Sequence, residues 1–173
     1  MTADPTVEQI LRVDHAGECG AIQIYRSQIA VARLLHPQCV DALAGMLEHE
    51  LRHFRIFDTL LKQRKIRTCY ALPLWKVGGW ILGSLTAVLG EKAIWVCTAA
   101  IENTVNQHLD HQVAALSAND PEALLAVQSI RRDEKEHEEH ALQHGGYGRG
   151  LYRVLRWAVK GATSLAIWLS TKL

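Results

Sequence analysis

The stretch Leu47-Glu48-His49-Glu50-Leu51-Arg52-His53 fits two metal-binding patterns that belong to different folds. In H-E-x-x-H, the pattern of zinc metalloproteases, His49 and His53 bind one zinc ion and Glu50 is the general base. In E-x-x-H, the pattern of bundles that hold two metal ions, Glu50 and His53 are both ligands. His49 then has no role. The rest of the chain decides between the two.

A second E-x-x-H motif, Glu134-Lys135-Glu136-His137, has the same surroundings as the first. A glutamate precedes each motif by 32 positions (50 − 18 and 134 − 102), and a proline precedes each by 13 positions (50 − 37 and 134 − 121). These residues are Glu18, Glu102, Pro37 and Pro121. A shift of 84 positions (134 − 50) therefore relates the two halves of the chain. The pattern indicates a duplicated helix pair.

Proline, glycine and apolar residues at helical spacing divide the chain into six predicted helices, and no stretch favours a strand. Asp4-Pro5 is typical of an N-cap followed by proline at the first helical position. The predicted helices cover residues 5–35, 37–65, 73–89, 91–116, 119–143 and 151–172. The sequence thus predicts one all-α domain, residues 1–173. It has helix pairs at about 5–65 and 91–143, an apolar crossover helix at about 73–89 and an amphipathic C-terminal helix.

The repeated motifs place six metal-binding side chains on four helices. Residues i and i+3 lie on one helix face, so each E-x-x-H presents its Glu and its His together. Four carboxylates and two imidazoles form the ligand set of a carboxylate-bridged di-iron or di-manganese site in a ferritin-like bundle. Without metal ions, six ionisable groups in a core would be very costly. We therefore predict a ferritin-like four-helix bundle with these metal ligands: Glu18, Glu50, His53, Glu102, Glu134 and His137.

The zinc-protease alternative explains less of the sequence. It gives no role to the glutamates and the histidine outside the first motif, and the second half has Asp133 where the first has His49. We therefore interpret His49 as incidental. Two interpretations of Asp133 stay open: a carboxylate that orients a ligating imidazole, or a solvated acid in the charged run 131–139.

Composition limits the partners and the compartment. The chain of 173 residues has a formal net charge of +1, so there is no electrostatic case for a nucleic-acid partner. Its four cysteines, at positions 19, 39, 69 and 97, form no CxxC pair and suit a reducing compartment. The N-terminal residues show neither a secretory signal nor an Arg-rich transit peptide. We expect a bacterial protein that faces the cytosol, or a trimmed mature form.

Two segments are candidates for contact with a membrane surface. The run 77–90 is uncharged but only 14 residues long (90 − 76), whereas a spanning helix needs roughly 20 apolar residues. The last predicted helix carries Trp157 and Trp168 beside Arg153, Arg156 and Lys160. Interfacial tryptophans and a basic face are typical of a helix that lies in a membrane surface. The alternative for both segments is an ordinary buried bundle helix.

Several stretches match those of a known enzyme family. They are Val13-Asp14-His15-Ala16-Gly17-Glu18, both E-x-x-H motifs, Leu72-Pro73-Leu74-Trp75, Ile101-Glu102, Asp133-Glu134 and Trp168-Leu169-Ser170. With them the chain resembles the demethoxyubiquinone hydroxylase family, di-iron enzymes that install the last ring hydroxyl in ubiquinone biosynthesis, over nearly its whole length, from about residue 8 to residue 173. It departs at Cys19 and Leu109, where family members often have tyrosine. Neither position is a predicted ligand.

The resemblance implies a role for each ligand and a set of reactants. It implies that Glu50 and Glu134 bridge the two irons and that Glu18 and Glu102 are terminal ligands. It also implies one histidine for each iron, His53 and His137. It further implies O₂ as co-substrate, a prenylated benzoquinone as substrate and NADH as the electron donor. The sequence has no dinucleotide fingerprint, because Gly148-Arg149-Gly150 lacks the further glycine at position 153.

An isoprenoid substrate lies in the bilayer, so the resemblance favours membrane-surface positions for residues 73–89 and 151–172. It implies a peripheral protein on the cytoplasmic face of the bacterial inner membrane. For a trimmed eukaryotic form, the matrix side of the mitochondrial inner membrane takes its place. Other ubiquinone-biosynthesis proteins are candidate partners.

Two more side chains near the predicted ligands have open roles. His108, six positions after Glu102, faces the substrate, donates to a ligand or lies at the surface. Tyr25, seven positions after Glu18 and on the same helix face, packs in the core, which we favour, or contacts a ligand.

Three functions are compatible with these residues. The first is the quinone monooxygenase, the second is another ferritin-like activity (peroxidase, manganese catalase or iron store), and the third is a non-enzymatic helical protein on membranes. The apolar segment 73–89 and the Trp-bearing segment 151–172 favour the first over the second, since a soluble peroxidase has no need of them.

Overall fold

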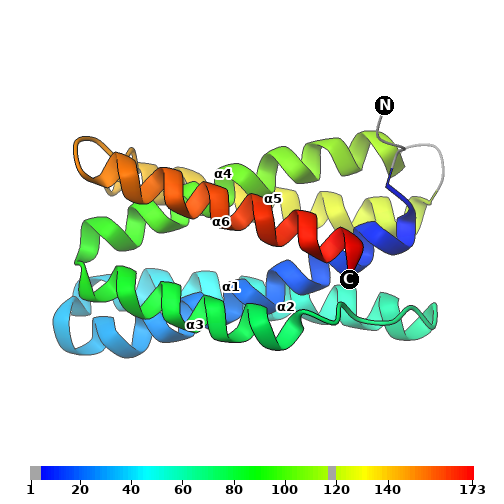
Figure 1. The fold of residues 1–173 in the computed structure, drawn as a ribbon, viewed down its shortest axis with the longest axis horizontal. Coiled ribbons are helices and arrows are strands. Elements are labelled where there is room, and N and C mark those ends of the chain that lie inside the picture. Colours follow the sequence, from blue (N-terminus) through cyan, green and yellow to red (C-terminus); the bar gives the residue numbers. More distant parts are fainter. Residues whose placement is uncertain (1–4, 117–119) are drawn as a thin grey trace.

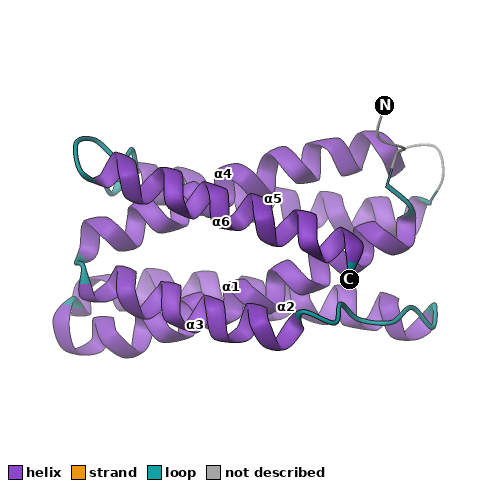
Figure 2. Cartoon of the chain, in the orientation of Figure 1, coloured by secondary structure: helices purple, strands orange, loops and turns teal. Residues whose placement is uncertain are grey.

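In the computed structural model, which describes residues 5–116 and 120–173, six α-helices are joined by short connections (Figure 2). They are α1 Val7–Leu35, α2 Val40–Gln63, α3 Leu72–Val88, α4 Glu91–Leu116, α5 Pro121–Gln143 and α6 Tyr152–Lys172. A 3-10 turn, Pro37–Cys39, precedes α2. These described residues contain no strand. The all-α prediction is confirmed.

The helices form two layers that correspond to the two halves of the sequence (Figure 1). Helices α1, α2 and α3 form one layer, and α4, α5 and α6 form the other. Within the layers, α1 packs against α2 and α3, and α4 packs against α5 and α6. The four helices with the predicted ligands, α1, α2, α4 and α5, make up the bundle. Helices α3 and α6 cover one side of it.

A capping box decides where α1 begins. The Thr6 hydroxyl accepts a hydrogen bond of 3.2 Å from the Gln9 backbone N–H, and the Gln9 side chain accepts one of 3.0 Å from the Thr6 N–H. Because these bonds satisfy two N–H groups that the first turn leaves free, the helix starts at Val7. The predicted start at Pro5 is therefore wrong, and Asp4 lies outside the described residues.

The observed ends of α2 and the start of α5 lie within a few residues of the predicted ones. Pro37 opens the 3-10 turn, so α2 begins at Val40. Lys65 has a φ of 56°, a left-handed conformation that cannot continue an α-helix, and α2 ends before it. Asp120 caps α5, because its carboxylate accepts a hydrogen bond of 3.0 Å from the Ala123 N–H. This helix begins at Pro121, and the predicted start at Asn119 lies outside the described residues.

Two glycines let α3 lie directly on α1. A Cβ atom added at Gly79 would come within 2.5 Å of the Gly20 carbonyl oxygen. A Cβ atom at Gly83 would overlap the Ile24 carbonyl oxygen and the Ser27 hydroxyl. Only glycine permits this approach of two backbones. One face of α3 is therefore fixed against α1, and the opposite face is turned outward.

The outward faces of α3 and α6 carry large apolar side chains. Val77, Trp80 and Leu85 of α3 and Trp157 and Trp168 of α6 are between 56 % and 73 % exposed. The alternative of ordinary buried helices is wrong for these faces. None of the helices in residues 5–116 and 120–173 combines the length and the hydropathy that a membrane span requires.

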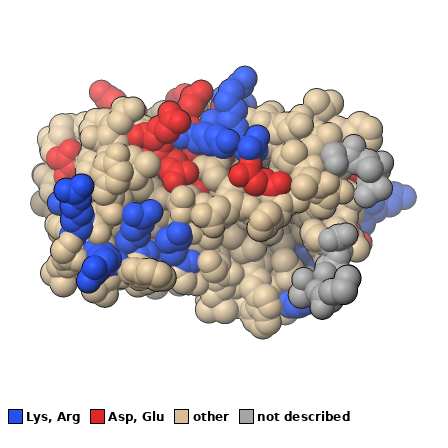
Figure 3. All heavy atoms as spheres, turned by 90° about the horizontal axis from the view of Figure 1, so that it is seen from above, with Lys and Arg blue, Asp and Glu red and all other residues tan. Residues whose placement is uncertain are grey.

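Basic side chains lie beside the apolar face of α6. This helix carries Arg153, Arg156 and Lys160, and Figure 3 shows Lys and Arg side chains gathered near the end of the molecule where α6 begins. Arg153 is exposed. Lys160 donates a hydrogen bond of 2.7 Å to Asn103 Oδ1 on α4, which holds α6 against the bundle.

Candidate active site

The structure brings the six predicted ligands together in the middle of the bundle. They form two overlapping groups whose ligand atoms lie within 4.8 Å of one another. The first group is Glu18, Glu50, His53 and Glu134, and the second is Glu50, Glu102, Glu134 and His137. All six side chains are buried. Glu50 and Glu134 belong to both groups, which is the arrangement needed for two metal ions bridged by two carboxylates.

Both imidazoles turn the same ring nitrogen toward the carboxylates. His53 Nδ1 lies 3.0 Å from Glu134 Oε1 and 3.7 Å from Glu18 Oε2. His137 Nδ1 lies 3.4 Å from Glu50 Oε1 and 3.3 Å from Glu134 Oε2. In both E-x-x-H motifs, the i, i+3 spacing places the histidine beside the glutamate on the inner face of its helix.

The concentration of negative charge shifts the pKa values of the carboxyl groups. Burial and the neighbouring carboxylate of Glu50 raise the pKa of Glu18 well above its usual range. Burial and the carboxylate of Glu134 do the same for Glu102. Burial also acts to raise the pKa of Glu134, but the close imidazoles of His137 and His53 outweigh it and hold that pKa below its usual range.

The two imidazoles respond in the opposite direction. Burial acts to lower the pKa of His53, but the close carboxylates of Glu134 and Glu18 outweigh it and raise that pKa to about 11. Burial also acts to lower the pKa of His137, but the close carboxylates of Glu134 and Glu50 raise it to about 9. The cluster thus attracts positive charge strongly.

Unpartnered atoms show that this cluster fits metal cations. Glu50 Oε1, His53 Nδ1, Glu134 Oε2 and His137 Nδ1 are buried and have no hydrogen-bond partner among the described residues. Such atoms are rare in folded proteins. Two divalent cations would give them partners and would balance the charge of four carboxylates while both imidazoles stay neutral. Carboxylate oxygens with imidazole nitrogens suit iron or manganese.

The outer nitrogen of each imidazole, Nε2, contacts the residue that precedes the opposite motif. His53 Nε2 lies 3.0 Å from Asp133 Oδ2, and His137 Nε2 lies 3.0 Å from His49 Nδ1. Asp133 is 7 % exposed, which excludes the interpretation as a solvated acid. Burial acts to raise the pKa of Asp133, but hydrogen bonds with His53 and Arg52 outweigh it and leave that pKa lowered.

The interpretation of His49 as incidental overlooked its contact with His137. Neither metal-binding group found in residues 5–116 and 120–173 includes His49, so the structure gives no support to a zinc site built on it. The duplication could have indicated this contact. His49 and Asp133 are 84 positions apart (133 − 49) and are equivalent positions in the two halves, so a contact with a ligating imidazole considered for Asp133 applies to His49 as well.

Tyr25 belongs both to the core and to the site. Its ring is 2 % exposed and packs with Ile29, Leu43 and neighbouring apolar residues. Its hydroxyl donates a hydrogen bond of 2.8 Å to Glu102 Oε1. Burial and the Glu102 carboxylate raise the pKa of Tyr25 well above its usual range. The favoured core interpretation is therefore incomplete.

A cavity of about 300 Å³ leads from the cluster toward α3 and α6. Its inner end is lined by the four cluster glutamates, and its walls come mainly from apolar residues of α1, α3, α4 and α6. Gly78 of α3 and Ala162 of α6 line its outer end and are exposed at the surface. The cavity therefore connects the cluster with the side of the molecule that carries the exposed apolar faces.

Two further polar side chains line this cavity. His108 is half-buried, and its Nε2 has no hydrogen-bond partner within the described part of the chain, which fits the cavity-facing interpretation. The second is Asp14, which was not among the predicted site residues. It lies four residues before Glu18, and its Oδ1 accepts a hydrogen bond of 2.7 Å from the Gln112 amide. Burial raises the pKa of Asp14 to about 7.

Cys19 and Leu109, the two positions at which the sequence departs from the family pattern, lie close to the cluster. Leu109 is buried and lines the cavity, and Cys19 is buried beside Glu18. Leu109 is the equivalent of Tyr25 in the second half (109 − 25 = 84). The hydrogen bond from Tyr25 to Glu102 therefore has no tyrosine counterpart at position 109.

Comparison with known proteins shows the family of this chain. Residues 5–170 match the family described as ubiquinone biosynthesis protein COQ7. The chain belongs to the COQ7 family. The resemblance to demethoxyubiquinone hydroxylases that the sequence motifs indicated is thereby confirmed, and the match extends over nearly all of the described residues.

Relatives of this COQ7-family protein carry hydroxylase names. A 3-demethoxyubiquinol 3-hydroxylase of Rhodospirillum rubrum is 37 % identical over 166 residues, which cover 96 % of this chain and 78 % of the relative. The mitochondrial NADPH-dependent 3-demethoxyubiquinone 3-hydroxylase of Mus musculus is 34 % identical over 170 residues, with 96 % and 77 % covered. The mitochondrial 5-demethoxyubiquinone hydroxylase of Saccharomyces cerevisiae is 29 % identical over 182 residues, with 96 % and 78 % covered.

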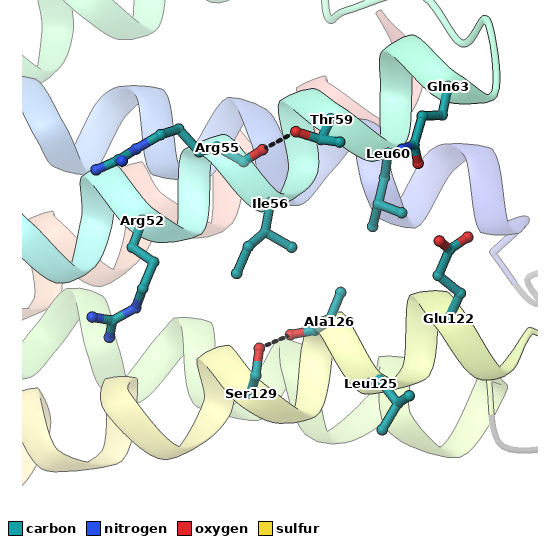
Figure 4. A pocket seen from close by; sticks show the side chains of 10 residues that line it. All are labelled: Arg52, Arg55, Ile56, Thr59, Leu60, Gln63, Glu122, Leu125, Ala126 and Ser129. Atoms are coloured by element: carbon teal, nitrogen blue, oxygen red, sulfur yellow. Dashed lines mark hydrogen bonds between the residues drawn. The ribbon is translucent and has the colours of Figure 1, made fainter.

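A second hollow of this COQ7-family protein, between α2 and α5, has a different character (Figure 4). It is an open groove of about 620 Å³. Ile56 and Leu60 of α2 point toward Ala126 of α5, and Arg52 and Glu122 lie near its two ends. No metal-binding group in the described residues lies in this groove. The cavity that ends on the cluster is therefore the candidate active site.

Proposed function

We propose that this protein hydroxylates the ring of a demethoxyubiquinone-type prenylated substrate with two bound iron ions, O₂ and reducing equivalents from a nicotinamide dinucleotide. The chain is an enzyme of a family whose relatives are named as hydroxylases of such rings. One structural observation carries the proposal: the cavity opens between α3 and α6 and ends on the four cluster glutamates. A flat apolar ring with an isoprenoid tail suits a cavity of this lining.

The six cluster residues are proposed to hold the two ions as the overlapping groups indicate. Glu50 and Glu134 would bridge them. Glu18 and His53 would complete one position, and Glu102 and His137 the other. Bound iron would supply the redox chemistry that activates O₂ for insertion into the ring.

The surrounding residues prepare the site for this reaction. The apolar cavity walls exclude water and hold the ring against the cluster. Tyr25 fixes the carboxylate of Glu102 through its hydroxyl, and Asp133 and His49 fix the two imidazoles from behind. These contacts keep the ligands in place before the ions and the substrate bind.

The source of the electrons is proposed by class. The sequence resemblance implied NADH, whereas the relative from Mus musculus is named NADPH-dependent. We propose a reduced nicotinamide dinucleotide and leave the choice between the two to the activity assay. The described residues contain no strand and hence no βαβ unit of a Rossmann fold. The electrons would thus enter without a dinucleotide-binding site of that type.

The substrate is proposed to enter from a lipid surface. The exposed apolar faces of α3 and α6 flank the outer end of the cavity, and α6 adds basic side chains. A helix with tryptophans and arginines in this pattern suits the headgroup region of a bilayer. The proposed location is the cytoplasmic face of a bacterial inner membrane, or the matrix side of the mitochondrial inner membrane for a eukaryotic source. Other ubiquinone-biosynthesis proteins stay candidate partners.

The other ferritin-like activities fit the structure less well. A peroxidase, a manganese catalase or an iron store acts on small soluble reactants. Such a protein has no use for a cavity walled by apolar residues, or for two helices with outward apolar faces. A non-enzymatic membrane-surface protein does not explain why six ionisable side chains are buried together.

The test is an assay of the purified, iron-reconstituted protein with a short-tailed demethoxyubiquinone, O₂ and either NADH or NADPH. Mass spectrometry should find a product heavier by one oxygen atom, and metal analysis should find two irons per chain. Glu102→Ala should lose the product, whereas Glu139→Ala, an exposed residue of α5, should retain it. A protein that carries both irons but turns over hydrogen peroxide, and no quinone, would show that the proposed function is wrong.

A further inference from the structure

The two residues behind the cluster imidazoles are equivalent in sequence but unlike in chemistry. Asp133 and His49 each precede the glutamate of an E-x-x-H motif, and each contacts the histidine of the other motif. Each contact therefore crosses between α2 and α5. The duplication preserved the position and the crossing contact, while one half has a carboxylate and the other an imidazole.

Metal binding at Nδ1 defines the direction of both hydrogen bonds. A neutral imidazole that binds a cation through Nδ1 carries its proton on Nε2 and donates it. Asp133 Oδ2 then accepts from His53 Nε2, and His49 Nδ1 accepts from His137 Nε2, both at 3.0 Å. His49 can accept only with an unprotonated Nδ1, so its own proton lies on Nε2.

A carboxylate and a neutral imidazole are acceptors of different strength. A charged acceptor forms a hydrogen bond roughly twice as strong as a neutral one. It also makes the donating imidazole a stronger metal ligand. The guanidinium of Arg52 lies 2.6 Å from Asp133 Oδ2 and helps to hold this carboxylate behind His53. Behind His137 lies the His49 ring, which stacks on it at a centroid distance of 5.1 Å.

We propose that Asp133 and His49 are positioning residues that make the two metal positions unequal, so that the position with His53 binds its ion more tightly than the position with His137. This inference rests on the proposed two-metal site. It goes beyond that site because the six ligands alone form two matching halves, each with one terminal glutamate, one histidine and the two shared glutamates. The difference between the positions comes from the residues behind them.

The experiment is a titration of metal-free protein with cobalt(II) against a competing chelator, followed by visible absorption. Two binding steps of unequal strength are expected for the unmodified chain. Glu18→Ala removes a ligand from the His53 position alone and thus identifies that step. Asp133→Asn should weaken the same step by roughly 10- to 100-fold and leave the other nearly unchanged. His49→Ala should weaken only the other step, and by less.

A replacement in the opposite direction sharpens the test. His49→Asp places a carboxylate behind His137, so the weaker step should become tighter and approach the stronger one. Glu48→Ala and Glu136→Ala, exposed neighbours on α2 and α5, are matched controls that should change neither step. If Asp133→Asn unfolds the metal-free chain in circular dichroism, Asp133→Glu takes its place.

The outcomes separate this inference from the proposed function. Two equal steps in the unmodified chain, or equal weakening of both steps by Asp133→Asn and His49→Ala, would overturn the inference while the two-metal site stands. Binding of a single ion, or of none, would overturn the two-metal site and the inference with it. Unequal steps that converge in His49→Asp would support the inference.

Discussion

The hydroxyl of Tyr25 on α1 donates a hydrogen bond of 2.8 Å to Glu102 on α4, and so links the first half of the chain to a predicted ligand of the second. Glu102 is buried, and it belongs to the metal-binding group that contains His137. The tyrosine therefore stabilises the fold and fixes a proposed ligand through one contact.

Tyr25→Phe keeps the ring in the core and removes this hydrogen bond. We expect the metal-free protein to lose about 1 kcal/mol in its free energy of unfolding. That loss corresponds to a fall of about 2–4 °C in the melting temperature for a chain of this size. Thermal denaturation followed by circular dichroism measures it. Tyr147→Phe, at a residue 58 % exposed, is the matched control and should melt as the unmodified protein does. An unchanged melting temperature in Tyr25→Phe would show that the bond adds nothing to stability.

Glu134→Ala tests the sharing of ligands. Glu134 belongs to both metal-binding groups, so its removal should abolish binding of both ions together. Metal analysis of the purified variant should find neither iron, whereas Glu136→Ala, an exposed residue on the same helix, should keep both. Retention of one zinc per chain in Glu134→Ala, together with its loss in His49→Ala, would restore the zinc-protease interpretation.

Asp14 predicts a pH dependence of stability. Burial raises the pKa of Asp14 from 3.8 to about 7, so the folded chain holds its proton more tightly than the unfolded chain does. A raised pKa contributes stability that is fully present below pH 3.8 and is lost as the pH rises toward 7. Asp14→Asn has no charge to bury. Its free energy of unfolding relative to the unmodified chain should therefore rise between these pH values by an amount on the order of a few kcal/mol.

Urea denaturation of metal-free protein at several pH values measures this difference without a contribution from metal release. Asp41→Asn, at an exposed residue of α2, is the control and should show no comparable rise. A constant difference between Asp14→Asn and the unmodified chain across the whole range would mean that the pKa of Asp14 is the same in the folded and the unfolded chain.

Binding to anionic liposomes tests the proposed membrane face. Arg153→Gln with Arg156→Gln should weaken binding at low salt and reduce its salt dependence, because each basic residue near an anionic surface contributes about 1 kcal/mol. Arg33→Gln with Arg55→Gln, two exposed arginines of α1 and α2, should change binding little. Sedimentation with liposomes measures both pairs.

The apolar part of this attraction should persist in high salt. Trp157 is 73 % exposed, so Trp157→Ala should reduce the binding that salt leaves, with little effect on the fold. A folded protein that ignores anionic liposomes at low salt would refute the membrane-surface proposal. The cavity would then have to receive its substrate from solution.

Sequence patterns determined the helices and the predicted ligands because both depend on short-range regularities. Proline and glycine positions bounded the helices to within a few residues. The i, i+3 spacing of Glu50 and His53, repeated 84 positions later, indicated which side chains share a helix face. The predicted start of the first helix at Pro5 was wrong because the capping box of Thr6 and Gln9, a motif that the sequence also contains, was overlooked.

The tertiary structure decided what lies behind and beside those ligands. His49 is close to His137 only because α2 and α5 meet across the bundle, and Tyr25 reaches Glu102 only because α1 and α4 do. Asp14 lines the cavity because the cavity is enclosed by helices from both halves of the chain. Spacing along one helix carries no information about such contacts, since they depend on how separate helices pack. The sequence determined the predicted ligand set, and packing decided which residue lies behind each of its two histidines.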